Sequence, residues 1–117
     1  DLLNYKSPIP ICADESFHSL EDFERIANKY DSINIKLDKT GGLSEAIEIK
    51  KYAHENNKII MIGCMVSSSL SMMPAVTLCN DVKFVDLDGP CFLKSDVQNG
   101  LSYKNGVISF KEDSCWG

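Results

Sequence analysis

The chain has 117 residues, of which 44% are hydrophobic and 25% are charged, and its formal net charge is −5 at pH 7. This composition is typical of one globular unit and argues against a disordered or membrane-spanning chain, since the longest apolar run, residues 59–65, is far shorter than the roughly 20 residues that cross a bilayer. The chain has only 12 Lys and Arg residues, and they form no basic cluster of the kind that binds nucleic acid.

The first predicted strand covers residues 8–12, a short apolar run that leads into the acidic residues Asp14 and Glu15. A helix is predicted next, from the candidate N-cap Ser19 to about Tyr30, because apolar residues recur there every three or four positions. The chain therefore begins with a strand, acidic residues at its end, and a helix.

The second predicted strand, residues 32–37, carries a lysine within a hydrophobic run. Successive side chains of a strand point to opposite faces, so the isoleucines lie on one face and Asn34 and Lys36 on the other. A buried ammonium without a partner is costly, and we therefore expect Lys36 to be either paired or used in chemistry. The Gly41-Gly42 pair predicts a tight turn before the next helix.

Two more β/α units follow in the same order. We expect a helix over residues 44–56, a strand over 58–62, a helix over 70–79 and a strand over 83–87. The predicted strands begin every 24 to 26 residues. This spacing predicts an α/β fold with parallel strands and right-handed crossovers, as in part of a TIM-type (β/α) barrel.

Each predicted strand ends in polar or reactive residues, namely Asp14, Lys36, Cys64 and the pair Asp86 and Asp88. The carboxyl ends of parallel strands lie at one rim, where α/β enzymes build their active sites. We therefore expect these side chains to converge. Asp86 and Asp88 share one strand face, which suits them to bind a ligand ammonium.

The repeat stops at Pro90, and residues 101–110 are predicted to form a β-hairpin that turns on Asn105-Gly106. We therefore expect residues 1–90 to form the C-terminal half of a barrel and residues 91–117 to form a tail. A half-barrel leaves two sheet edges and an apolar interior open, which indicates a fragment of a larger protein. Twofold self-association of a non-catalytic half-barrel is the alternative.

The cysteine content predicts a reducing compartment. The five cysteines are odd in number and include no Cys-x-x-Cys pair, so neither a disulfide framework nor a zinc site is expected. A cytoplasmic location follows. Cys64 has no adjacent base and is not expected to act as a nucleophile.

Four motifs in order carry a resemblance to a known family: Ala-Asp-Glu-Ser at 13–16, Asn-Ile-Lys-Leu-Asp-Lys-Thr-Gly-Gly at 34–42, Gly-Cys-Met at 63–65 and Asp-Leu-Asp-Gly-Pro at 86–90. The chain resembles the dipeptide epimerases of the enolase superfamily, in particular the L-Ala-D/L-Glu epimerases of murein-peptide recycling. The resemblance covers nearly the whole chain, but only the last four strands of that family's barrel and its C-terminal tail.

The resemblance implies an isomerase that transfers a proton at the Cα of a dipeptide with the help of Mg²⁺. It implies that Asp14 is one of three carboxylate ligands of the metal. Lys36 matches one of two lysines that face each other across the substrate Cα. A metal ion stabilises the enediolate formed when the Cα loses its proton, and nearby positive charge is expected to lower the pKa of Lys36.

The resemblance also assigns the substrate contacts. Asp86 and Asp88 match the residues that hold the substrate's α-ammonium, and Cys64 and Val66 match positions whose backbone contacts the dipeptide. The other metal ligands, the opposite lysines and a capping domain, on which the tail would pack, are expected to precede this chain. The chain alone is therefore expected to be inactive, and the complete protein is expected to be a homo-oligomer without a nucleic acid or membrane partner.

Less specific interpretations of the same residues remain open. Asp14 could be a helix-entry acid, Lys36 could be a buried ion-pair partner, and Asp86 and Asp88 could cap the turn at Gly89. N-acylamino acid racemases and cycloisomerases are the nearest functional rivals. An acylated substrate has no ammonium for the two aspartates to hold, which favours a dipeptide.

Overall fold

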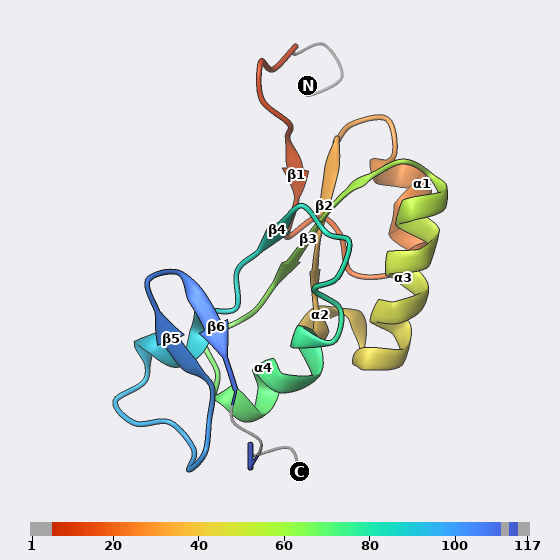
Figure 1. The fold of residues 1–117 in the computed structure, drawn as a ribbon. Helices are drawn as coiled ribbons and strands as arrows, with labels where there is room; N and C mark the ends of the chain where they lie inside the picture. The colour runs from red at the N-terminus through yellow and green to blue at the C-terminus, as the bar shows by residue number, and fades with distance from the viewer. Residues whose placement is uncertain (1–5, 111–112, 115–117) are drawn as a thin grey trace.

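The computed structural model describes residues 6–110 and 113–114. Its centre is a sheet of four parallel strands that pair in chain order. Figure 1 shows these strands with the helices α1 and α3 on one side. The strands are β1 (Cys12–Ala13), β2 (Ser32–Lys36), β3 (Ile59–Gly63) and β4 (Phe84–Val85). The predicted α/β fold with a parallel sheet is confirmed.

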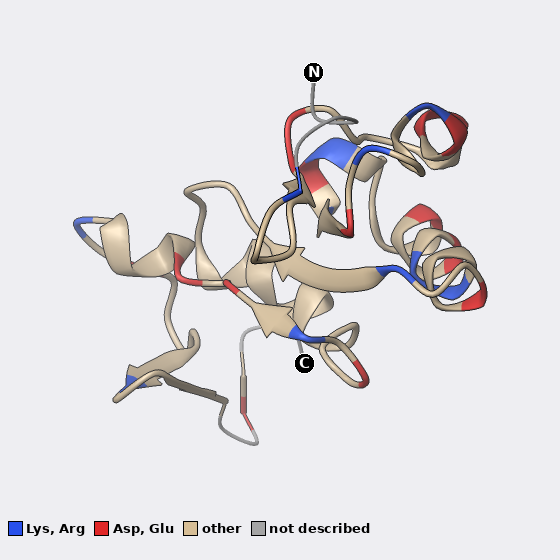
Figure 2. Ribbon diagram, turned by 90° about the horizontal axis from the view of Figure 1, so that it is seen from above, with Lys and Arg blue, Asp and Glu red and all other residues tan. Residues whose placement is uncertain are grey.

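Helical segments connect these strands. They are η2 (Leu20–Asp22), α1 (Phe23–Ile26), α2 (Leu37–Thr40), α3 (Leu43–Glu55), α4 (Ser69–Val76) and, after β4, η3 (Gly89–Phe92). Figure 1 shows α1 and α3 side by side, and the rings of Phe23 and Tyr52 pack in a T-shaped arrangement with centroids 4.7 Å apart. Helix α3 carries both acidic and basic residues (Figure 2). No helix in the described part is long and apolar enough to cross a membrane.

Several elements differ from the sequence prediction. The strand predicted over 83–87 covers only Phe84–Val85, and the helix predicted over 70–79 runs from Ser69 to Val76. The first strand is shorter than residues 8–12 because Pro8 and Pro10 have no amide hydrogen for a sheet bond. The predicted helix over residues 19–30 is only a 3-10 turn followed by one α-helical turn. Leu37 begins α2 instead of ending a strand, and this helix was not predicted; it ends at Gly41, whose φ of +83° is left-handed.

The two faces of the sheet differ in chemistry. One face buries the alternate isoleucines of β2 and β3 against α3, whose buried residues are Ala46, Ile49 and Ala53. The other face carries a polar row, which consists of Ser32, Asn34 and Lys36 on β2. The Oγ of Ser32 and the Oδ1 of Asn34 are buried and have no hydrogen-bond partner within the described residues.

The tail turns back on the sheet end as an antiparallel hairpin, β5 (Ser102–Lys104) and β6 (Val107–Ser109). Asn105 and Gly106 at its tip have φ values of 52° and 75°, as a two-residue turn with two left-handed positions requires. The predicted hairpin is confirmed. The proposed domain boundary at residue 90 stays a prediction.

Candidate active site

Four charged side chains meet where β1 and β2 end. The Nζ of Lys36 lies 2.9 Å from Oδ1 of Asp14 and 3.5 Å from Oε1 of Glu15, and the Nζ of Lys39 lies 2.7 Å from the same Asp14 oxygen. Lys39 also donates to the Asp14 carbonyl at 2.7 Å. The lysine side chains are only 11% and 9% exposed, whereas that of Asp14 is 43% exposed. Lys36 was expected to be either paired or used in chemistry, and the structure shows it paired.

These contacts set the protonation of the cluster. Burial raises the pKa of Asp14, but hydrogen bonds from Lys39 and Lys36 outweigh it and hold that pKa below its ordinary value. Burial lowers the pKa of Lys36, but the hydrogen bond and charge of Asp14 and the charge of Glu15 outweigh it and raise that pKa. Within this chain acidic partners dominate the surroundings of Lys36 and raise its pKa. The lowering expected from the positive charge of a complete metal-containing site stays a prediction.

Lys39 belongs to the cluster, although sequence reasoning left it out. It follows Lys36 by three residues across the first turn of α2, and residues three apart on a helix lie on the same side. Its partner Asp14 is 25 residues earlier in the chain. The three-residue spacing between Lys36 and Lys39 indicates a shared side only if the chain there is helical, so Lys39 could be found only once α2 was recognised.

The loop after β3, residues 64–68, packs against the start of η3. A Cβ on Gly89 would lie 2.6 Å from the Met65 carbonyl oxygen and 3.1 Å from the Ser67 nitrogen, so only glycine allows this approach. Burial raises the pKa of the Cys64 thiol, although the Gly89 amide donates to it. Cys64 is thus a neutral, partly buried thiol, and Val66 is 65% exposed.

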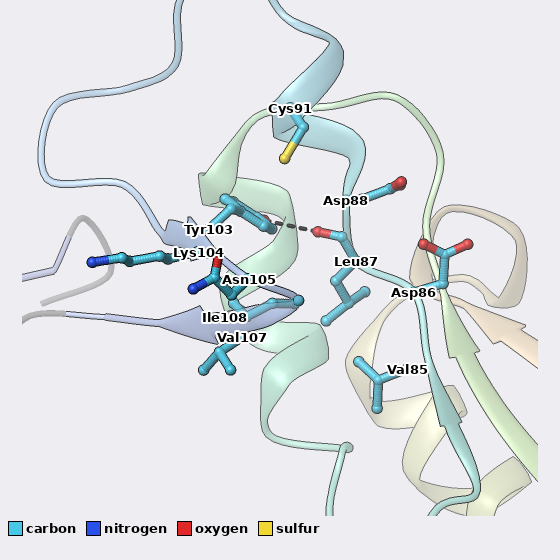
Figure 3. Close-up of a pocket in the computed structure, with 11 residues that line it drawn as sticks. Val85, Asp86, Leu87, Asp88, Cys91, Tyr103, Lys104, Asn105, Val107 and Ile108 are labelled. Carbon is cyan, nitrogen blue, oxygen red and sulfur yellow. Dashed lines mark hydrogen bonds between the residues drawn. The ribbon is translucent and has the colours of Figure 1, made fainter.

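Asp86 and Asp88 follow β4 and form a pair of like charges. Figure 3 shows both carboxylates turned away from the hairpin, whereas Val85 and Leu87 point toward it. Burial, and then the charge of Asp88, raises the pKa of Asp86. Within the described residues neither carboxylate has an ion-pair partner, so the pair is suited to attract a cation. A cavity of about 360 Å³ separates this segment from the hairpin.

The described residues alone do not form a complete metal site. No three His, Cys, Asp or Glu side chains among the described residues are placed to hold a metal ion. Asp14 offers the hard carboxylate oxygen that Mg²⁺ prefers, but Lys36 and Lys39 contact its Oδ1. The assignment of Asp14 as a metal ligand therefore stays a prediction, and further ligands would have to come from outside the described residues.

The structure brings the predicted residues to one rim but not into one cluster. Asp14 and Lys36 are in contact. The charge of Lys36 opposes the rise in the pKa of Asp86 but does not reverse it. Cys64 lies beside Gly89, the first residue of η3, which follows Asp88 in the chain. Val66 extends outward and contributes no side chain to the ion cluster.

Comparison with known families gives one match over residues 2–114, to the family described as enolase C-terminal domain-like. Among curated relatives, N-acetyl-D-glutamate racemase of Pseudoalteromonas sp. is 44% identical over 99% of this chain and 37% of its own length. L-Ala-D/L-Glu epimerase of Escherichia coli (strain K12) is 42% identical over 92% of this chain and 33% of its own length. The chain thus spans about a third of the length of the curated relatives it matches.

Solved structures confirm the resemblance. An enolase family member from Agrobacterium tumefaciens with homology to dipeptide epimerases, with bound sodium and L-Ala-L-Glu, has a TM-score of 0.88 and 48% identity over 93% of this chain and 33% of its own. A dipeptide epimerase from Methylococcus capsulatus, complexed with Mg and L-Arg-D-Lys, has a TM-score of 0.81 and 30% identity over 94% of this chain and 34% of its own.

Proposed function

Since the chain belongs to the enolase C-terminal domain-like family, we propose that it is part of an epimerase that transfers a proton at the Cα of a dipeptide. The observation that carries the proposal is the pairing of buried Lys36 with Asp14 at the rim that also holds the Asp86–Asp88 pair. Lys36, the proposed proton-transfer group, ends β2, and the Asp86–Asp88 pair, the proposed ammonium site, follows β4 at the same end of the sheet.

Lys36 is the proposed acid and base on one face of the substrate. Its contacts with Asp14 and Glu15 fix the ammonium at the end of β2, where it can give a proton to the Cα and, once neutral, take one. Epimerisation also requires a group on the opposite face. That group is proposed to lie outside this chain.

The substrate's amino end is proposed to bind between Asp86 and Asp88. Two carboxylates that repel each other gain a common partner when an ammonium enters, and charge-assisted hydrogen bonds of this kind are strong. Cys64 and Val66 are proposed to contact the dipeptide through their backbone, since the loop that carries them packs on the residue after Asp88. A substrate of the L-Ala-L-Glu type fits these assignments, and a role in murein-peptide recycling is part of the proposal.

The proposed cofactor is Mg²⁺, supported by the Mg-complexed relative and by the carboxylate of Asp14. A bound divalent cation would stabilise negative charge on the substrate carboxyl group. The proposal includes an N-terminal half-barrel and a capping domain beyond this chain, because the relatives are about three times as long. It also includes self-association and a cytoplasmic location; Cys12, Cys64, Cys79 and Cys91 are free thiols.

A racemase of N-acylated amino acids is the second candidate, and the 44% identity to the N-acetyl-D-glutamate racemase favours it. Such a substrate carries no ammonium. Asp86 and Asp88, which have no ion-pair partner among the described residues, would then have no ligand charge to balance, and we therefore place this candidate second.

The two candidates can be separated with the complete gene product that carries this chain. Deuterium incorporation at Cα should be measured in deuterated water with L-Ala-L-Glu and with N-acetyl-D-glutamate. Asp88→Asn should raise the KM for the dipeptide by about tenfold or more, since a hydrogen bond to a charged group contributes about 1.5 to 3 kcal/mol. Asp81→Asn, at an exposed turn with a φ of 56° that asparagine tolerates, is the matched control.

Exchange with N-acetyl-D-glutamate alone would establish the second candidate. Exchange with neither compound, tested together with a broader dipeptide panel, would reject the proposed function and leave the non-catalytic half-barrel. An unchanged KM for Asp88→Asn would remove the aspartate pair from the substrate site.

A further inference from the structure

A side-chain carboxylate from the tail is bound at the start of α4. Asp96 Oδ1 accepts hydrogen bonds from the backbone amides of Ser69 at 2.9 Å and Val97 at 2.8 Å, and its Oδ2 accepts one from the Ser69 hydroxyl. Ser69 is fully buried, and its Oγ also accepts the Leu101 amide at 2.8 Å. We call this group of hydrogen bonds among Asp96, Ser69 and Leu101 the clasp.

The clasp is tightly packed. A Cβ on Gly100 would lie 2.8 Å from both Asp96 Oδ2 and Ser69 Oγ, so only glycine can bring the backbone this close. The first backbone amides of a helix have no partner within the helix, and the side chain of the N-cap residue Ser68 accepts no hydrogen bond from them here. Asp96 instead accepts the hydrogen bond from the Ser69 amide. The clasp therefore fixes the point where the 64–68 loop becomes α4.

A second contact from the tail fixes the other proposed substrate segment. The hydroxyl of Tyr103 donates to the Leu87 carbonyl at 2.7 Å (Figure 3). Leu87 is 1% exposed and lies between Asp86 and Asp88. Gly89 then joins the two segments, since its backbone packs directly on the 64–68 loop.

We infer that residues 96–103 form a strap that positions the dipeptide-binding residues, with Asp96 holding the 64–68 loop and Tyr103 holding the Asp86–Asp88 segment. This inference rests on the proposed function. Neither residue is proposed to touch the substrate. Each acts through the backbone of the segment it holds, and small displacements of such segments reduce binding of a ligand held at several points.

A purely stabilising role for the same contacts makes a different prediction. Loss of the clasp would then lower the unfolding temperature but leave substrate affinity unchanged at temperatures far below unfolding. The variants Asp96→Ala, Asp96→Asn and Tyr103→Phe test the difference in the complete gene product. Ser95→Ala, at the exposed neighbour of Asp96, and Tyr52→Phe, on the remote helix α3, are matched controls.

Two quantities should be measured at a temperature where all variants are folded: KM and kcat for L-Ala-L-Glu, and amide hydrogen exchange in residues 64–68 and 86–88. Asp96→Ala should raise KM about tenfold with a smaller change in kcat, the effect of losing hydrogen bonds to a charged group. Exchange should quicken by a similar factor in residues 64–68. Asp96→Asn keeps the Oδ1 acceptor and should recover part of both losses.

Tyr103→Phe should quicken exchange at 86–88 and raise KM, while both controls should match the wild type. Unchanged KM and exchange in the folded Asp96→Ala and Tyr103→Phe proteins would overturn the inference. If the wild type processes no dipeptide, the proposed function fails. The exchange comparison still decides whether the strap orders the two segments, and no change in exchange would then reject it.

Discussion

Gly63 is the position where one methyl group should disturb the sheet most sharply. It pairs with Lys36 in the parallel register, and a Cβ built there would lie 2.8 Å from Nδ2 and 3.0 Å from Cγ of Asn34, and closer still to Oδ1. Asn34 is 3% exposed, so its amide cannot swing into solvent. Gly63→Ala should therefore force the two strands or the amide out of place.

The magnitude follows from two opposing effects. Overpacking a filled interior costs about 1 to 3 kcal/mol, whereas replacing glycine by alanine within a strand recovers about 0.5 to 1 kcal/mol of backbone entropy. We expect Gly63→Ala to lower the free energy of unfolding by about 1 to 2 kcal/mol. Asn34→Ala removes all three colliding atoms, so the double variant should lose clearly less than the two single losses together.

Urea unfolding of the wild type, Gly63→Ala, Asn34→Ala and the double variant measures this coupling. The expected coupling free energy is about 1 kcal/mol in the stabilising direction. An unchanged urea midpoint for Gly63→Ala would show that the Asn34 amide moves without cost. Strict additivity in the double variant would show that the collision is relieved elsewhere.

Three further predictions concern stability. The ammonium of Lys58 donates hydrogen bonds to the carbonyls of Ala27 and, at 2.8 Å, of Tyr30. Lys58→Met removes these bonds and should lower the free energy of unfolding, measured in urea, by about 1 to 2 kcal/mol. An unchanged free energy of unfolding would mean that water replaces the ammonium at the two carbonyls. Burial raises the pKa of Asp96, but the hydrogen bonds that its carboxylate accepts outweigh burial and lower that pKa. The carboxylate therefore stabilises the folded chain fully at a pH above the pKa of the unfolded state. This stabilisation should be lost as the pH falls through the pKa of the folded state. Melting temperatures should therefore drop more on acidification for the wild type than for Asp96→Asn, and equal drops would contradict this. Gly106 has a φ of 75°, which strains an alanine. Gly106→Ala should therefore increase hydrogen exchange in the hairpin but not in β2, and an equal change in both segments would refute this prediction.

The parts of the fold that follow from local patterns were predictable. Alternating isoleucines on β2 and the apolar run of β3 indicated the strands, because each signal lies within a few residues. The regular spacing of the strands then predicted the parallel sheet. The Asn105-Gly106 turn was equally local, since both residues adopt the left-handed φ that the hairpin needs.

The parts that depend on distant partners were not predictable. Helix α2 has only four residues, too few for a periodic pattern, and Lys39 was overlooked with it. The raised pKa of Lys36 depends on Asp14 and Glu15, which approach only when β1 pairs with β2. Asp96 lies 27 residues after Ser69 in the chain, and no sequence pattern in the tail predicts the contact between them.

The sheet order has a consequence for how the protein folds. Each strand pairs with the strand before it, and the paired residues lie only 20 to 27 positions apart, as in Cys12 with Ser32, Ser32 with Ile59 and Met61 with Phe84. Every newly made β/α unit can therefore dock on an edge that already exists, without waiting for a distant part of the chain. Short loop closures of this kind cost little entropy, and they allow the sheet to grow in one direction while the ribosome is still at work.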